Sequence, residues 1–188
     1  MRKIALTVIL CMALCGTAAC SSGQPENAEV ATEMTTEVPE ATTEAAVTKT
    51  IPLNTETQIG DWNVMVTGSE TSDRIEDDGL YFELNEEGNR YFIINASVEN
   101  TGKQVESFIS SYPVEDDYGA KIVYGDGYEY NVSNLLGYSK GLLDNPVNPL
   151  TSKDGQIVFE VPKDVADSDG PFTLNIYNSS ETYNFTVK

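Results

Sequence analysis

The chain of 188 residues contains no histidine, and its three cysteines (Cys11, Cys15 and Cys20) all lie near the N-terminus. An imidazole is the usual base that activates a serine or cysteine nucleophile, so hydrolysis of that type is excluded. A zinc site of the common kind is nearly excluded, because cysteine and histidine supply most zinc ligands. We therefore expect a protein that is not an enzyme. A hydrolase that uses only carboxylates is the remote alternative.

Basic residues are also scarce. Lysine and arginine together number 11 against 30 aspartates and glutamates, which gives a formal net charge of -19. Proteins bind nucleic acid through clustered lysines and arginines, so we expect no nucleic-acid partner. An anionic bilayer surface would repel the folded part of the chain for the same reason. The charge favours a soluble domain that stays apart from its neighbours.

Aromatic residues are missing from the first part of the chain. The one Trp, ten Tyr and six Phe residues all lie between Trp62 and Phe185. Aromatic side chains contribute much of the buried surface of a small core. We therefore predict three segments: a signal peptide over residues 1–19, a tether over residues 20–54, and one folded domain over residues 55–188.

The N-terminal residues are typical of an export signal. Arg2 and Lys3 are followed by an apolar run, residues 4–14, that is too short to span a bilayer as a stable helix. Small residues then lead directly into a cysteine: Gly16-Thr17-Ala18-Ala19-Cys20-Ser21-Ser22. This run resembles the lipobox of bacterial lipoproteins, with Thr17 where leucine is usual. The alternative is an ordinary secretory signal cleaved after Ala19.

The resemblance implies that cleavage leaves Cys20 as the first residue and that its thiol carries a diacylglyceryl group. Cys11 and Cys15 would leave with the signal peptide, so that no internal disulfide could form. Two or more acyl chains anchor a protein durably in a lipid bilayer, whereas one chain is marginal. We expect the protein on the outer face of the cell membrane, with this covalent lipid as its only prosthetic group.

Residues 20–54 are rich in threonine, glutamate and alanine and contain no aromatic residue. Their glutamates repel one another, and the first base after Cys20 is Lys49. Such a segment cannot bury enough apolar surface to offset the entropy of ordering it. We predict a disordered acidic tether that holds the domain away from the bilayer.

The remainder of the chain alternates apolar and polar residues with period two, which indicates β-strands. Examples are the Trp62, Val64 and Val66 series and the Phe92, Ile94, Ala96 and Val98 series, in which Ile93, Asn95 and Ser97 face the opposite way. We predict turns at residues 100–102, 117–119, 154–155 and 169–171 from their Asn, Asp, Gly and Pro content. No stretch shows a helical period beyond a turn or two. The pattern predicts an all-β protein, an antiparallel β-sandwich.

Three sequence motifs that follow one another along the chain strengthen this prediction. They are residues 91–102, which end in Glu99-Asn100-Thr101-Gly102, the turn at residues 116–119, and residues 155–162, which end in Phe159-Glu160-Val161-Pro162. Together they resemble a family of bacterial lipoprotein domains of unknown function, related to the secreted mycobacterial immunoprotective antigen. The resemblance covers residues 55–188 and implies an immunoglobulin-like fold, with no activity attached.

One long connection holds candidate ligand-binding residues. Residues 124–150 contain Tyr124, Tyr128, Tyr130 and Tyr138 among glycine, asparagine and aspartate. A tyrosine ring offers an apolar face and a hydroxyl, which suits recognition of sugars or proteins. The alternative is that these rings pack down over an open sheet edge.

Acidic clusters raise the question of calcium, which binds carboxylate oxygens. The weak candidate is Glu115, Asp116 and Asp117, beside a predicted tight turn. Acidic residues in the loops of a β-sandwich are more often simply solvated.

The sequence therefore favours a non-catalytic surface lipoprotein whose immunoglobulin-like domain binds a protein or another component of the cell envelope. The alternative is a carbohydrate-binding module that uses the Tyr124–Tyr138 loop against cell-wall glycan. The sequence favours no particular oligomeric state.

Overall fold

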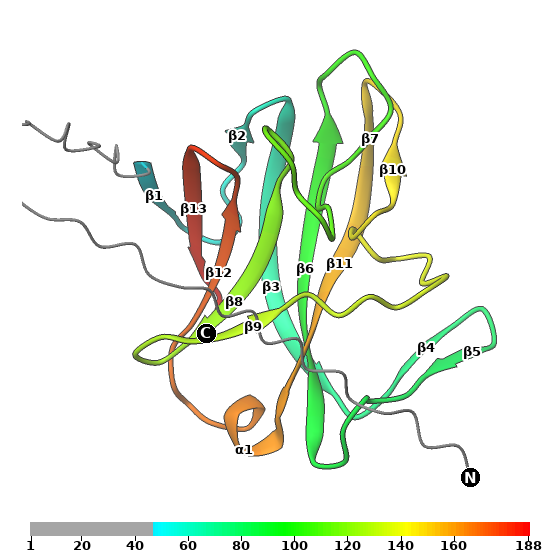
Figure 1. The fold of residues 1–188 in the computed structure, drawn as a ribbon, viewed down its shortest axis with the longest axis vertical. Helices are drawn as coiled ribbons and strands as arrows, with labels where there is room; N and C mark the ends of the chain where they lie inside the picture. Colours follow the sequence, from blue (N-terminus) through cyan, green and yellow to red (C-terminus); the bar gives the residue numbers. More distant parts are fainter. Residues whose placement is uncertain (1–46) are drawn as a thin grey trace, which may run out of the picture. The chain divides into compact units, whose positions relative to one another are not determined.

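The computed structural model describes residues 47–188, which form two packed β-sheets and some small additional elements (Figure 1). The predictions for Cys20, the signal peptide and residues 20–46 of the tether lie outside the described residues. Within residues 47–188 the model has no helix of the length and apolarity that a membrane span requires.

The first sheet has five strands and the second has four. In spatial order the first comprises β1 (Val47–Ile51), β13 (Glu181–Thr186), β12 (Phe172–Tyr177), β8 (Gly119–Tyr124) and β9 (Tyr128–Asn131). In spatial order the second comprises β11 (Thr151–Pro162), β6 (Asn89–Asn100), β3 (Trp62–Ser72) and β2 (Thr57–Ile59). The other described elements are the hairpin of β4 (Ile75–Asp77) and β5 (Leu80–Phe82), the pair β7 (Glu106–Ser107) and β10 (Pro146–Val147), and the short helix α1 (Lys163–Ala166).

The inner faces of the two sheets form the main core. The predicted inward series are buried as expected, including Trp62, Val64 and Val66 on β3. Between the sheets, Phe92 of β6 stacks on Phe172 of β12 with ring centroids 4.3 Å apart. Each large apolar side chain buried here contributes about 1.5–3 kcal/mol relative to exposure. The predicted β-sandwich is thus confirmed.

The first strand begins before the domain boundary predicted at residue 55. β1 pairs with β13 in parallel, from Val47 opposite Glu181 to Ile51 opposite Phe185. Ile51 is buried in the main core, whereas Thr48, Lys49 and Thr50 are exposed. With only Val47 and Ile51 as apolar residues and no aromatic ring, β1 gives only a weak strand pattern. Its pairing is parallel, whereas the other strand pairs within residues 47–188 are antiparallel as expected, apart from two isolated parallel bridges.

The predicted turn at Asp154 and Gly155 is wrong, because both residues lie within β11. Asp154 pairs with Ser97 and Gly155 with Ala96 on β6. A side chain at Gly155 would meet Leu142 at 2.6 Å and the Lys140 carbonyl oxygen at 2.8 Å. Glycine is therefore present because residues 140–142 pair closely alongside the strand, and not because the chain turns.

A second apolar cluster covers part of the outer face of the second sheet. Ile93 of β6 and Val158 of β11 point away from the main core, yet both are buried. The β4–β5 hairpin and residues 133–141 supply their cover, with buried contributions from Ile75 and Tyr138. Outward-facing apolar residues on β6 and β11 are explained by this cover, which leaves the rest of the outer face open.

Candidate ligand-binding groove on the outer sheet face

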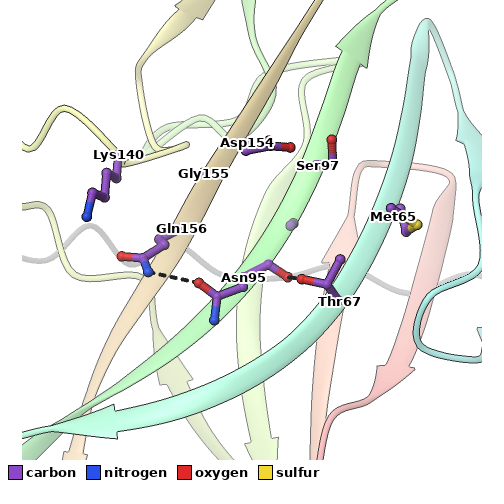
Figure 2. A pocket seen from close by; sticks show the side chains of 9 residues that line it. Met65, Thr67, Asn95, Ser97, Lys140, Asp154, Gly155 and Gln156 are labelled. Carbon is purple, nitrogen blue, oxygen red and sulfur yellow. Dashed lines mark hydrogen bonds between the residues drawn. The ribbon is translucent and has the colours of Figure 1, made fainter.

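The open half of this outer face is hollowed. A cavity of about 510 Å³ is lined by Met65, Thr67, Asn95, Ala96, Ser97, Lys140, Asp154, Gly155 and Gln156. An adjoining hollow of about 200 Å³ is lined by Glu56, Asn63, Met65, Ser97, Glu99 and Ser152. The two share Met65 and Ser97, and we call their union the sheet-face groove. Figure 2 shows the larger cavity, with lining side chains from β3, β6 and β11.

Strand register sets the composition of the groove. Ser97 of β6 lies between Met65 of β3 and Asp154 of β11. One row along, Glu99 lies between Asn63 and Ser152. Because alternate residues of a strand face the same side, these rows share the outer face. The groove is therefore built on three paired strands, the rigid part of the fold.

Hydrogen bonds hold several of these side chains in place. The Gln156 side-chain nitrogen donates to Asn95 Oδ1 at 2.8 Å, as Figure 2 shows, and to Glu70 Oε1 at 3.3 Å. The Tyr138 hydroxyl donates to Gln156 Oε1. Asn63 Nδ2 donates to Glu99 Oε2 at 3.0 Å. Side chains fixed in this way lose little rotational entropy when a ligand binds.

Other groups in the groove have no partner among residues 47–188. The Asp154 carboxylate and the Lys140 ammonium group form none of the ion pairs or side-chain hydrogen bonds in this part of the chain, and both residues are exposed. The hydroxyls of Ser97 and Ser152 are equally unengaged there. These groups can therefore bind a ligand without first breaking a contact.

The groove carries an excess of negative charge. Glu56, Glu99 and Asp154 line it, and Glu70 bonds to the Gln156 amide at its margin. Lys140 is the single base among its lining residues. This balance favours cationic or neutral ligands and disfavours anions.

The structure divides the four candidate tyrosines. Tyr124, Tyr128 and Tyr130 belong to β8 and β9, whereas Tyr138 lies in the apolar cluster on the second sheet. Tyr138 is 7% exposed and packs edge-on against Phe82 with centroids 5.5 Å apart. Burial raises the pKa of Tyr138 to about 12. Its ring is thus part of the packing, and its hydroxyl orients Gln156 from the side.

Of the three tyrosine rings on β8 and β9, two pack against other side chains. Tyr124 lies 4.9 Å from Phe172, and Tyr130 is partly buried against the core, where burial raises its pKa. Tyr128 is 67% exposed. The predicted loop of four ligand-binding rings is therefore reduced to one exposed ring, and packing accounts for the others.

The acidic residues considered for calcium do not converge. Asp117 Oδ2 accepts a hydrogen bond from the Val114 backbone nitrogen at 3.3 Å, which stabilises the turn. Glu115 is exposed, with φ of 52°. Asp116 and Asp117 line a separate hollow of about 460 Å³ near Tyr118. Within the described part of the chain, no three aspartate, glutamate, histidine or cysteine side chains are grouped to hold a metal ion.

Sequence reasoning missed the groove, although part of its signal was visible. Asn95 and Ser97 stand out as small polar residues at outward positions, directly after the apolar run of residues 91–94 on the same strand. The prediction of a turn at Asp154 and Gly155 starts the neighbouring strand too late, so it does not place Asp154 on that face. The contribution of Lys140 depends on the path of residues 133–141, for which the sequence gives no periodic pattern.

A model of one protein family, the domain of unknown function DUF4352, matches residues 51–183. The chain belongs to this family. The DUF4352 match covers most of the β-sandwich and agrees with the expected membership in a domain family of unknown function. No match was found among curated proteins.

Solved structures share the fold of the DUF4352 domain. An uncharacterized β-sandwich protein from Clostridium difficile 630 is 22% identical, with a TM-score of 0.57 over 77% of this chain and 97% of that one. The secreted Mycobacterium tuberculosis protein MPT63 is 14% identical, with a TM-score of 0.50 over 76% of this chain and 99% of that one. At these identities the likeness shows a common β-sandwich fold.

Proposed function

We propose that this protein is a lipoprotein held at the outer face of the cell membrane through diacylglycerol on Cys20. Its DUF4352 domain would be a non-catalytic module that binds a protein of the cell envelope. The anchor is supported by the short apolar run, residues 4–14, and by the small residues that lead into Cys20. The absence of histidine from the whole sequence supports a binding role over nucleophilic catalysis.

One structural contrast carries the proposal of binding. On the outer face of the second sheet, Ile93 and Val158 are covered by the hairpin and by residues 133–141. The adjoining half of the same face is open and presents small polar side chains in hydrogen-bonded order. Ligand sites are concave, with a few convergent polar groups fixed in advance, and the sheet-face groove has these properties.

The anchor can be tested with Cys20→Ala. We expect this variant to move from the membrane fraction to the soluble fraction, because it has no thiol to acylate. Cys15→Ala is the matched control and should stay with the membrane. Mass spectrometry of the N-terminal peptide should show the acylated Cys20. An unmodified thiol, or a Cys20→Ala protein that remains in the membrane, would contradict the anchor.

The binding role can be tested by site-specific photo-cross-linking on intact cells. A cross-linking amino acid in place of Ser97 should give an adduct of discrete mass, because the ligand lies over the groove. The same amino acid in place of Asp126, in the exposed turn between β8 and β9, is the control. Identical adduct patterns at both positions would argue against the groove as the binding surface.

Carbohydrate binding is the alternative. Tyr128 favours it, since this ring is 67% exposed and could stack on a sugar. Loss of glycan binding in Tyr128→Ala would support this alternative.

A further inference from the structure

We infer that the sheet-face groove binds an extended peptide segment that carries basic side chains. This inference rests on the proposed binding function and names the chemistry of its ligand. The groove runs over successive rows of paired residues, centred on Asn95, Ser97 and Glu99 of β6. Rows on one strand face are about 6.8 Å apart. Alternate residues of an extended peptide have the same spacing, so such a peptide can meet each row in turn.

The hydrogen-bonding groups match a peptide backbone. Beside their bonds within the groove, the Asn63 and Asn95 side-chain amides each keep one N–H donor and an oxygen lone pair, whereas Gln156 donates both amide hydrogens to Asn95 and Glu70 and can only accept. The Ser97 and Ser152 hydroxyls can both donate and accept, and they are unengaged within residues 47–188. A peptide likewise presents an N–H donor and a C=O acceptor at each residue. The groove can therefore satisfy backbone groups along its length without depending on one ligand sequence.

The charge of the groove determines which ligand side chains it favours. Glu56, Glu99 and Asp154 line the groove against the single base Lys140. The Asp154 carboxylate is exposed and has no ion-pair partner in the described chain. A lysine or arginine in the ligand would supply the missing charge, and such complementarity raises both association rate and specificity. An acidic peptide would be repelled.

The floor of the groove favours a peptide over a sugar. Met65 is the one large apolar side chain of this floor, since the Ala96 side chain packs in the main core and Gly155 has none. No aromatic residue is among the residues that line the two hollows. Sugar rings are commonly held by stacking on an aromatic face, which this floor does not offer. Methionine adapts its shape to varied apolar groups, which suits the stems of lysine and arginine side chains.

The test uses three probes: a blocked peptide of alternating glycine and lysine, its glycine and glutamate counterpart, and chitotetraose. Titration of the purified full chain with the lysine peptide should shift the side-chain amide NMR signals of Asn95 and Gln156. Asp154→Asn combined with Glu99→Gln should lower the affinity about tenfold, since each exposed charge pair contributes modestly. Raising the ionic strength should weaken binding by the wild-type chain.

A charge-matched control separates specific binding from attraction to an acidic protein. Asp126→Asn with Asp169→Asn removes two exposed carboxylates outside the groove and should keep wild-type affinity. Ser97→Lys, which puts a base in the groove, should abolish binding while circular dichroism shows an intact β-sheet. Equal affinity in the groove and control variants, no binding of the lysine peptide, or amide shifts with chitotetraose instead would each overturn the inference.

These outcomes are distinguishable from failure of the proposed function. If the lysine peptide fails while cross-linking at Ser97 still gives a position-specific adduct, the binding role stands and the ligand chemistry is wrong. If the cross-link is also absent, both proposals fail.

Discussion

Gly155 lies where residues 140–142 pair with the edge of β11 through a parallel bridge between Gly141 and Gln156, and this pairing leaves no room for a side chain. The nearest atoms to an added Cβ would be Leu142 Cδ2 at 2.6 Å, Leu142 Cγ at 2.7 Å and the Lys140 carbonyl oxygen at 2.8 Å. The Gln156 backbone nitrogen donates to that same carbonyl at 2.7 Å. This contact places Lys140 at the edge of the groove, so one glycine allows a loop residue to join a site built on strands.

Gly155→Ala should therefore be destabilising by about 1–3 kcal/mol, because residues 140–142 must move away from β11. Urea denaturation would measure the change. Gly68→Ala on β3 is the control, since an added Cβ there meets nothing within 4 Å. Its effect should stay within about 0.5 kcal/mol. Equal stability of the two variants would show that residues 140–142 pack loosely against β11.

The same residue shows where sequence reasoning fails. Asp-Gly between apolar runs is a strong turn signal. At Asp154 and Gly155 the glycine serves a tertiary contact with residues 140–142, and local pattern cannot distinguish such a contact from a turn. Ile93 and Val158 are similar, because their outward burial depends on a cover whose path the sequence does not reveal.

At the scale of elements, β1 is a strand that contributes to the first sheet although its own sequence gives little indication of a strand. Its alternation was not visible within a segment rich in threonine and glutamate. Pairing with β13 and burial of Ile51 nevertheless make it part of the first sheet. The stronger strands, β3, β6, β11 and β12, were predicted because each carries several large apolar residues at period two.

A chain that starts at residue 55 should be less stable than one that starts at residue 47, by about 2–5 kcal/mol, the range for truncation of one buried isoleucine. Denaturation midpoints of the two chains would test this. Within the full chain, Ile51→Ala should reproduce much of the loss, whereas Thr50→Ala, at an exposed position, should not. Equal midpoints would mean that β1 adds nothing to stability.

Hydrogen bonds to two carboxylates help to hold the segments that lie over the outer face of the second sheet. Asp77 of β4 accepts hydrogen bonds from the Ser139 nitrogen at 2.6 Å and from its hydroxyl at 3.0 Å. These bonds lower the pKa of Asp77. Burial raises the pKa of Glu160, but hydrogen bonds from Asn85, Asn89 and the Glu86 nitrogen outweigh burial, and the net pKa is lowered.

At the scale of the whole molecule, the lowered pKa values of Asp77 and Glu160 determine how far the pH can fall before the folded state loses stability. A carboxylate whose pKa is lowered by folding stabilises the folded state above its unfolded pKa, about 4, and the gain is lost as pH falls through the folded value. At high pH the sign reverses for Tyr118 and Tyr138, whose pKa burial raises to about 12. Their contribution is lost as pH rises above about 10.

The melting temperature should therefore be nearly constant from about pH 6 to 8, because the chain has no histidine to titrate there. It should fall below about pH 4 and above about pH 10. Thermal melts followed by circular dichroism across this range would test the profile. Glu160→Gln should lower the melting temperature at neutral pH and make the decrease of the melting temperature at acid pH less steep. A strong slope between pH 6 and 8 would contradict this account.

The pairing of β1 with β13 also has a consequence for the order of synthesis. A ribosome makes β1 first and β13 last of the described strands, yet the two are neighbours with partners 134 positions apart, from Val47 to Glu181. Contacts between such distant residues must wait until nearly all of the domain has emerged, which slows folding. A nascent chain that stops before β13 leaves β1 unmatched and the sheet edge bare, which invites aggregation. This topology therefore couples correct assembly to completion of the last strand.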